Sequence, residues 1–205
     1  MHIELTEMLR CPEPHREDAM VLSTGEMIGR MVRFGLVGCS VCHKEFLITN
    51  GIADFTGSAE QGAGSEQTTP RAPGSQLPAP GDLQALLELS GPGGFVVLLG
   101  DAARFAASLA GLMAGIHFVG VNAPADAEEL PVLSLLRASG GIPLRQSFAR
   151  GVVVGADLAT SPWLVEAHRI LLRGRRFVTL HDKPELPIGL EQLATAKGLW
   201  VGEKK

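Results

Sequence analysis

The fold is decided by residues 95–121, which read FVVLLGDAARFAASLAGLMAGIHFVGV. The run 95–99 is apolar throughout, as expected of a strand that is covered on both faces of a parallel sheet. Residues 101–114 predict a helix, and residues 116–121 predict a second buried strand. Strands that alternate with helices in this way indicate an α/β domain with a mostly parallel sheet.

The rest of the chain after residue 80 continues this alternation. Asp82 is a plausible N-cap for a helix over 83–89. Ser161 and Pro162 are typical of a helix start, and Gly174 is typical of its end. We expect further helices over 128–138 and 189–197, and further strands over 142–145, 151–154, 177–180 and 199–201.

Composition divides the chain into three blocks. With 205 residues and a hydrophobic fraction of 45%, the chain is long enough for one medium domain and a smaller unit. Residues 1–55 hold all three cysteines, whereas residues 56–80 have one leucine as their only bulky apolar residue. We therefore expect two folded units, 1–55 and 81–205, joined by a flexible linker over 56–80.

Charge and aromatic content limit the partners. A net charge of −4 argues against a strongly basic nucleic-acid binder, and an aromatic fraction of 5% leaves few side chains for base stacking. Glu4 and Glu7 interrupt the region where a secretory signal needs an apolar run. The uncharged stretch 105–125 reads as a buried helix and strand rather than a membrane span. The sequence thus predicts a soluble, cytoplasmic protein with no transmembrane segment.

The cysteines have metal-ligand spacing. Cys39 and Cys42 form a CxxC motif, and Cys11 and His15 form a second close pair of donors upstream. Two such pairs match a closed tetrahedral zinc site, which would contribute about 10 kcal/mol or more to a block too small to fold by burial alone. A pair of core thiols and a redox pair are the alternative interpretations. His43 competes with His15 as the fourth ligand.

The motifs around these cysteines resemble a known family. LRCP at 9–12 and CSVCHKEFLITNGIADF at 39–55 are similar to the short zinc ribbons that activate tRNA and release-factor methyltransferases. Members typically read CPxC, a variable hairpin, CxxC, an aromatic-Pro-Ile run and a GIP turn. This chain departs from the pattern at Pro14, which replaces the second cysteine, and at Ala53, which replaces the GIP proline. The resemblance implies a small module that packs against or activates a methyltransferase.

The third block resembles class I S-adenosylmethionine-dependent methyltransferases. The resemblance lies in the element order and in WLVEAHRILLRGRRFVTL at 163–180. It implies that the last antiparallel hairpin of the family's sheet is missing, because the chain ends soon after Val201. We therefore expect a Rossmann-like sheet that is shortened at its C-terminus.

The cofactor motifs of that family are eroded in this chain. The family places an acid and GxGxG after the first strand, but residues 98–104 keep only Gly100. The family also places an acid after the second strand, where this chain has Asn122. In an active methyltransferase, Gly100, Asp101, Asn122 and Asp157 would line the S-adenosylmethionine site, because ligands bind at the carboxyl ends of strands in open α/β sheets.

Three functions follow from these features. The first is a non-catalytic structural or interaction subunit that binds zinc and other protein subunits. The second is an active methyltransferase that holds S-adenosylmethionine in another way. The third is a regulatory module that binds RNA or an acidic protein through the basic residues of the first block, which are Arg10, Arg16, Arg30, Arg33 and Lys44.

Overall fold

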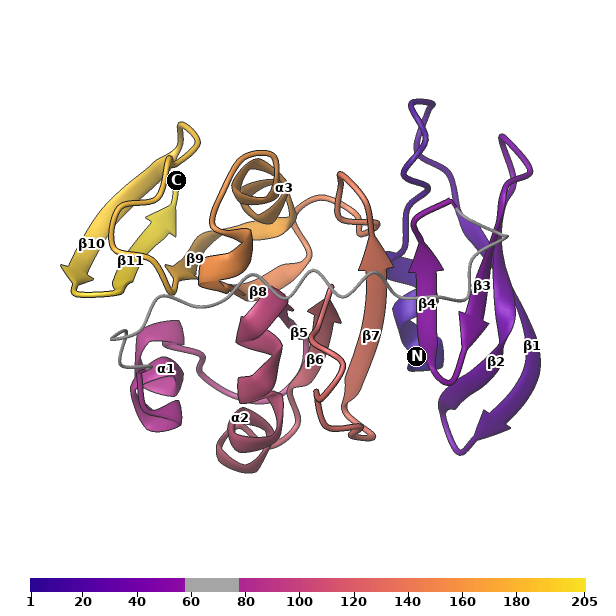
Figure 1. The fold of residues 1–205 in the computed structure, drawn as a ribbon, viewed down its shortest axis with the longest axis horizontal. Coiled ribbons are helices and arrows are strands. Elements are labelled where there is room, and N and C mark those ends of the chain that lie inside the picture. Colours follow the sequence, from indigo (N-terminus) through magenta and orange to yellow (C-terminus); the bar gives the residue numbers. More distant parts are fainter. Residues whose placement is uncertain (58–77) are drawn as a thin grey trace.

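The computed structural model describes residues 1–57 and 78–205, so most of the expected linker lies outside the described residues. Within them, the strands form a single sheet in the order β1-β2-β3-β4-β7-β6-β5-β8-β9-β11-β10 (Figure 1). The strands are β1 (Met20–Ile28), β2 (Met31–Cys39), β3 (Glu45–Thr49), β4 (Ile52–Phe55), β5 (Phe95–Leu99), β6 (His117–Val121), β7 (Leu133–Ala138), β8 (Ala149–Val154), β9 (Leu171–Thr179), β10 (Leu190–Ala196) and β11 (Leu199–Lys204). The helices are α1 (Pro80–Leu87), α2 (Ala106–Leu112) and α3 (Trp163–Ile170), with short 3-10 helices η1 (Ile3–Met8), η2 (Gly100–Phe105) and η3 (Ala156–Leu158).

The sheet is parallel in its middle and antiparallel at both ends. Strands β4, β7, β6, β5, β8 and β9 run parallel to one another, which confirms the expected α/β class. Strand β11 pairs antiparallel with β9, and β10 pairs antiparallel with β11. The expectation of a shortened sheet is therefore wrong, because the residues after β9 form the antiparallel hairpin that was expected to be missing.

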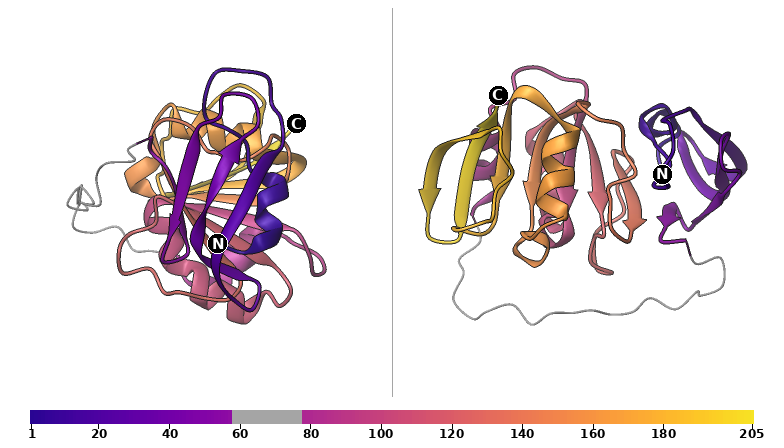
Figure 2. Two further views of the ribbon diagram at one scale, coloured as in Figure 1. Left: turned by 90° about the vertical axis from the view of Figure 1, so that its right-hand side faces the viewer. Right: turned by 90° about the horizontal axis from the view of Figure 1, so that it is seen from above.

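Two hydrophobic cores lie on opposite faces of this sheet. Because successive side chains in a strand point to opposite faces, Val97 and Leu99 pack toward α3, whereas Val96 and Leu98 pack toward α1 and α2. The two views in Figure 2 show the helices on both sides of the parallel strands. All four of these side chains are fully buried, which explains why the sequence of β5 is apolar without alternation.

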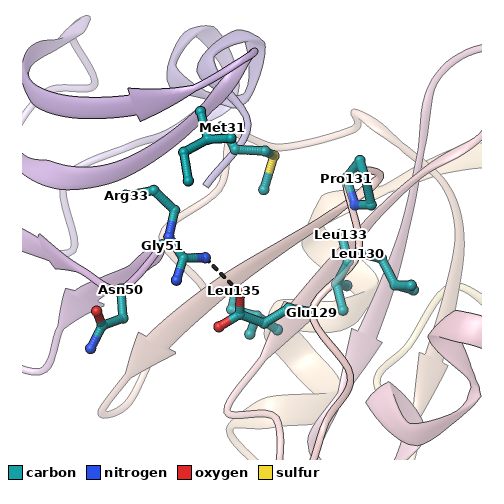
Figure 3. Close-up of a pocket in the computed structure, with 10 residues that line it drawn as sticks. Met31, Arg33, Asn50, Gly51, Glu129, Leu130, Pro131, Leu133 and Leu135 are labelled. Carbon is teal, nitrogen blue, oxygen red and sulfur yellow. Dashed lines mark hydrogen bonds and ion pairs between the residues drawn. The ribbon is translucent and has the colours of Figure 1, made fainter.

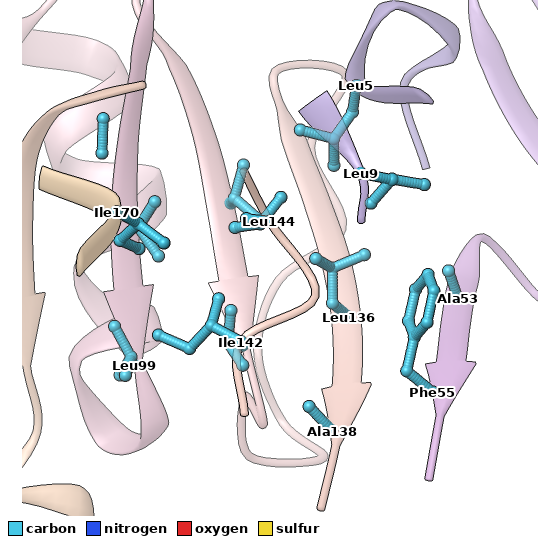
Figure 4. Packing of buried hydrophobic residues seen from close by; sticks show 14 of the residues in the cluster. Leu5, Leu9, Ala53, Phe55, Leu99, Leu136, Ala138, Ile142, Leu144 and Ile170 are labelled. Atoms are coloured by element: carbon cyan, nitrogen blue, oxygen red, sulfur yellow. The ribbon is translucent and has the colours of Figure 1, made fainter. Parts of the chain in front are cut away.

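The first block is built into the sheet rather than standing apart from it. Strand β4 pairs parallel with β7, with Ile52 opposite Leu135 and Phe55 opposite Ala138. Phe55 and Leu136 are almost completely buried in the same core, beside Leu5 and Leu9 (Figure 4). The first block and the parallel sheet therefore share one core. Burying each such side chain contributes about 1.5–3 kcal/mol to the stability of the fold.

A second set of contacts joins the first block to α3. The Arg10 main-chain N–H donates to the carbonyl of Pro143 at 3.1 Å. The Arg169 guanidinium donates to both oxygens of Glu166 at 2.9 Å and to the carbonyl of Leu144 at 2.8 Å. Glu166 also lies 3.9 Å from the guanidinium of Arg10. This network fixes the loop over 142–145 between α3 and the first block.

Two predicted helices are strands in the structure. Residues 128–138 were expected to be helical, but β7 forms because residues 133–138 lie between β6 and β4 and contribute to both cores. Burial on both faces removes the alternation that marks a half-buried strand. Residues 189–197 were also expected to be helical, but β10 is an exposed edge strand that pairs with β11. Pairing with β11 overrides the helix propensity of its leucine, glutamate and alanine residues.

Element boundaries also differ from the sequence expectations. Helix α1 begins at Pro80, so Asp82 is not the N-cap but accepts a hydrogen bond from the Ala79 N–H at 3.3 Å. Helix α3 ends at Ile170 instead of before Gly174, because Leu171 is already extended and begins β9. The Lys204 ammonium binds the carbonyls of His168 and Leu171 at 2.7 Å each. Residues 142–145 form only an isolated bridge to Leu9, and the helix expected over 101–114 divides into η2 and α2.

Candidate functional site

The structure brings the four predicted sulfur and nitrogen donors together. Cys11 and His15 lie in the loop after η1, while Cys39 ends β2 and Cys42 lies in the turn before β3. The four ligand atoms lie within 4.8 Å of one another. The Cys11 and Cys42 sulfurs are 3.7 Å apart, and the Cys39 sulfur is 3.4 Å from Nε2 of His15. All three cysteines are free thiols.

Hydrogen bonds orient these donors for a metal ion. Nδ1 of His15 lies 2.7 Å from the carbonyl of Arg16, so it donates there and leaves the Nε2 lone pair facing Cys39. Such a bond to the outer ring nitrogen is what fixes a ligating histidine. His43 is not part of the cluster, and its main chain has a positive φ of 57° in the turn. The donor set and its orientation fit tetrahedral zinc.

The thiols differ in acidity. Burial raises the pKa of Cys11 to about 12, because a thiolate there loses its hydration. The main-chain N–H of Lys44 stabilises the thiolate of Cys42 and lowers its pKa to about 7. Metal binding would therefore release the proton of Cys11, since only thiolates ligate zinc.

The second candidate site lies where the strand order reverses. The chain runs from β5 to β6 on one side and later enters β8 on the other, so the carboxyl ends of β5 and β8 border the crevice where α/β sheets bind ligands. Gly100 follows β5 with a φ of +58°, and Asp157 follows β8 in η3. The structure thus brings these two predicted residues into contact.

The Asp157 carboxylate fills the space above Gly100. A Cβ atom on Gly100 would lie only 2.6 Å from Cγ of Asp157, and one on Gly155 would be 2.8 Å from the main-chain nitrogen of Asp101. The Asp101 N–H donates to Oδ1 of Asp157 at 3.0 Å. Partial burial raises the pKa of Asp157, although that hydrogen bond acts in the opposite direction. The main-chain donor that faces the crevice is therefore bound to a carboxylate of the same chain.

The other two predicted cofactor residues also have partners within the chain. Asn122 donates from Nδ2 to the Ala138 carbonyl and accepts from the Ala138 N–H, both at 2.9 Å. These bonds join the ends of β6 and β7. The Asp101 carboxylate lies 3.4 Å from the Arg104 guanidinium. Both side chains are therefore engaged in contacts within the chain.

The basic residues of the first block are paired with carboxylates. Arg33 lies 2.6 Å from Glu129, and Lys44 lies 2.7 Å from Glu13. The remaining pairs are Arg10 with Glu17, Arg16 with Asp18, and Arg30 with Glu4. This charge pairing reduces the positive surface that the sequence suggested.

The Arg33–Glu129 pair borders a pocket of about 290 Å³ between β2 and the segment before β7 (Figure 3). Met31 and Gly51 line it from the first block, and Leu130, Pro131 and Leu135 line it from the α/β part. The pocket lies away from both candidate sites. The pocket is a space between the first block and the α/β part that side chains do not fill.

Sequence reasoning missed one further group of donors. His2, Glu4 and His117 place one ligand atom each within 4.8 Å of one another. His2 precedes η1, whereas His117 begins β6, so no local motif connects them. Only the pairing of the first block with the sheet brings them together.

No protein-family model and no curated protein matches the chain. Among solved structures, the antibiotic-resistance methyltransferase Kmr is 17% identical with a TM-score of 0.44, over 64% of this chain and 95% of that one. A complex between the Haloferax volcanii Trm112 methyltransferase activator and a putative methyltransferase is 21% identical with a TM-score of 0.39, over 48% and 50%. A SAM-dependent methyltransferase from Aquifex aeolicus is 13% identical with a TM-score of 0.45, over 61% and 88%.

Among the described residues, no helix is both long and apolar enough to cross a membrane.

Proposed function

We propose that this chain is a non-catalytic structural or interaction subunit, in which a zinc ribbon is joined to a methyltransferase-like sheet with a disabled cofactor edge. The observation that carries this proposal is the Asp157 carboxylate, which fills the space over Gly100 and accepts from the Asp101 N–H. A nucleotide-type cofactor needs close approach to that main chain at the end of the first parallel strand. The residues present do not fit S-adenosylmethionine.

Two further contacts support the loss of the cofactor site. Asn122 carries no charge, and both ends of its amide are bonded to Ala138. Asp101 is held by Arg104, which in turn pairs with Asp126. An adenosyl ligand that used the Asp101 N–H would have to displace the Asp157 carboxylate, and loss of that hydrogen bond costs about 1 kcal/mol.

Zinc supplies the stability of the first block in this proposal. Cys11, His15, Cys39 and Cys42 would hold one ion with closed coordination. A site with four protein ligands leaves no position for a substrate, so its role is structural. The core around Leu136 and Phe55 then keeps the ribbon fixed to the sheet.

The outward face of the ribbon supports contact with another protein. Leu36 in β2 lies opposite Ser23 in β1 and Leu47 in β3, so these three side chains are on one face of the sheet. Val21 and Phe34 are two positions from Ser23 and Leu36, so they lie on the same face. Val21, Phe34 and Leu47 on this face are 60%, 40% and 51% exposed. An exposed apolar surface of this kind favours a protein partner over RNA.

Calorimetric titration with S-adenosylmethionine tests the proposal. The zinc-loaded full chain should give no saturable heat, while an active methyltransferase in the same buffer serves as the positive control. Binding at micromolar affinity would overturn the proposal and favour the active methyltransferase, with Gly100, Asp101, Asn122 and Asp157 as its cofactor residues.

A further inference from the structure

A second group of metal-binding side chains lies where the first block meets the amino end of β6. His2 is 6% exposed, and its Nδ1 lies 3.9 Å from Oε2 of Glu4. The same nitrogen accepts a hydrogen bond from the Glu4 main-chain N–H at 3.4 Å, which leaves Nε2 of His2 as its free donor atom. The His2 and His117 rings pack with their centroids 4.8 Å apart. One possible ligand atom from each of His2, Glu4 and His117 lies within 4.8 Å of the other two.

One ring nitrogen of His117 has no partner in the part of the chain that the structure describes. Its Nδ1 is inaccessible to solvent and has no hydrogen-bond partner among the described residues. The ring is held in place by Phe95, 5.8 Å away between centroids, and by the main-chain bond from the His117 N–H to Gly94. A buried polar atom without a partner costs about 1–3 kcal/mol, so such an atom points to a missing ligand.

We propose that His2, Glu4 and His117 form a second site for a divalent transition metal such as Zn²⁺. Two imidazoles and one carboxylate are donors that zinc, cobalt and nickel accept. Bonds of about 2.0–2.1 Å to a tetrahedral zinc would bring the ligand atoms to about 3.3 Å from one another. Glu4 is exposed, so its side chain can turn to close the remaining distance.

The surrounding contacts prepare the site. Oε1 of Glu4 accepts from Arg30, which leaves Oε2 as the atom directed toward His2. The His2 main-chain N–H donates to the Ser134 hydroxyl at 2.9 Å, which fixes the residue against β7. The carboxylate and the backbone of His2 are thus positioned by groups outside the donor set.

A metal at this position would link the two halves of the molecule. His2 and Glu4 belong to the first block, whereas His117 belongs to the parallel sheet. The site is distinct from the cysteine cluster, because η1 separates His2 from Cys11. It lies at the amino ends of the strands, opposite the edge that carries Gly100 and Asp157. The inference does not depend on whether the protein is catalytic.

Cobalt titration of the metal-free full chain tests the second site. Total bound cobalt counts both sites, while the sulfur-to-cobalt charge-transfer absorption reports only the cysteine cluster. We expect two equivalents in the wild type. His117→Ala should bind one equivalent with its sulfur absorption unchanged, and His181→Ala is the matched control that should keep two.

Glu4→Gln guards against a folding defect in the histidine variant, because Glu4 is exposed. This variant should weaken the second equivalent about tenfold or more and leave the first unchanged. A wild-type chain that binds a single equivalent at saturation would overturn the proposal. So would unchanged uptake of the second equivalent in both His117→Ala and Glu4→Gln.

Discussion

Replacing Gly100 by alanine probes the contact between Gly100 and Asp157. The new Cβ would lie 2.6 Å from Cγ of Asp157, so the carboxylate must leave its place beside Asp101. The left-handed backbone of Gly100 costs alanine about 1–2 kcal/mol, and loss of the Asp101 hydrogen bond costs about 1 kcal/mol more. We expect Gly100→Ala to lower the free energy of unfolding by about 2–3 kcal/mol.

A double-mutant cycle separates the two contributions. In an Asp157→Ala background the steric conflict is gone, so Gly100→Ala should cost only the backbone term of about 1–2 kcal/mol. The coupling energy between the two positions is then about 1 kcal/mol, which exceeds the usual additivity error of about 0.3–0.5 kcal/mol. Urea denaturation in zinc-containing buffer provides the free energies.

Gly29→Ala is the matched control for this cycle. Gly29 has a φ of 59°, against 58° for Gly100, and its Cβ would meet no atom within 4 Å. Its substitution should therefore cost the backbone term alone, with no coupling to Asp157. If Gly100→Ala costs no more than Gly29→Ala and shows no coupling, the Asp157 carboxylate does not occupy the space above Gly100.

Three further predictions concern the metal, the joint between the blocks, and pH. Cys39→Ser should lose the thiolate-bound zinc and the amide protection of the first block in hydrogen exchange, whereas retained protection would show that the ion is dispensable. Leu136→Ala should cost about 2–5 kcal/mol, whereas exposed Leu47→Ala should change stability by at most about 0.5 kcal/mol; equal effects in chemical denaturation would exclude a shared core. Burial of Glu166 opposes its ionisation, but the hydrogen bonds and the charge of Arg169 outweigh burial and lower the pKa of Glu166 below the ordinary 4.5. The Glu166 carboxylate therefore stabilises the fold fully above pH 4.5, and this stabilisation is lost as the pH falls through the lower pKa of the folded state. Glu166→Gln should therefore cost about 1–3 kcal/mol at pH 7 and progressively less as the pH falls below 4.5, and a pH-independent difference would contradict this assignment.

The central strands could be predicted because a strand that is buried on both faces has a continuous run of apolar residues in its own sequence. The apolar runs at 95–99 and 151–154 lie within β5 and β8, and all of these residues except the partly buried Phe95 are buried. The same property concealed β7, because Leu133 and Leu136 face different cores and their spacing also suits a helix. Strand β10 was missed since its pairing with β11 is not encoded in its own composition.

The candidate sites differ in how much of each could be predicted from the sequence. The spacing of Cys39 and Cys42 is local, and the four donors it suggested do lie together. At the other edge, the sequence identified Gly100 and Asp157 separately but gave no sign that one covers the other. That contact depends on two loops brought together by the parallel pairing of β5 and β8. His2 and His117 meet only through the docking of the first block, so the sequence contains no motif for them.

A crystal structure grown with saturating S-adenosylhomocysteine would show whether the edge at Gly100 binds an adenosyl group. We expect no adenosyl density over Gly100, and Oδ1 of Asp157 about 3.0 Å from the Asp101 nitrogen. Ordered ligand density in that place, with the Asp157 carboxylate turned away, would contradict this expectation.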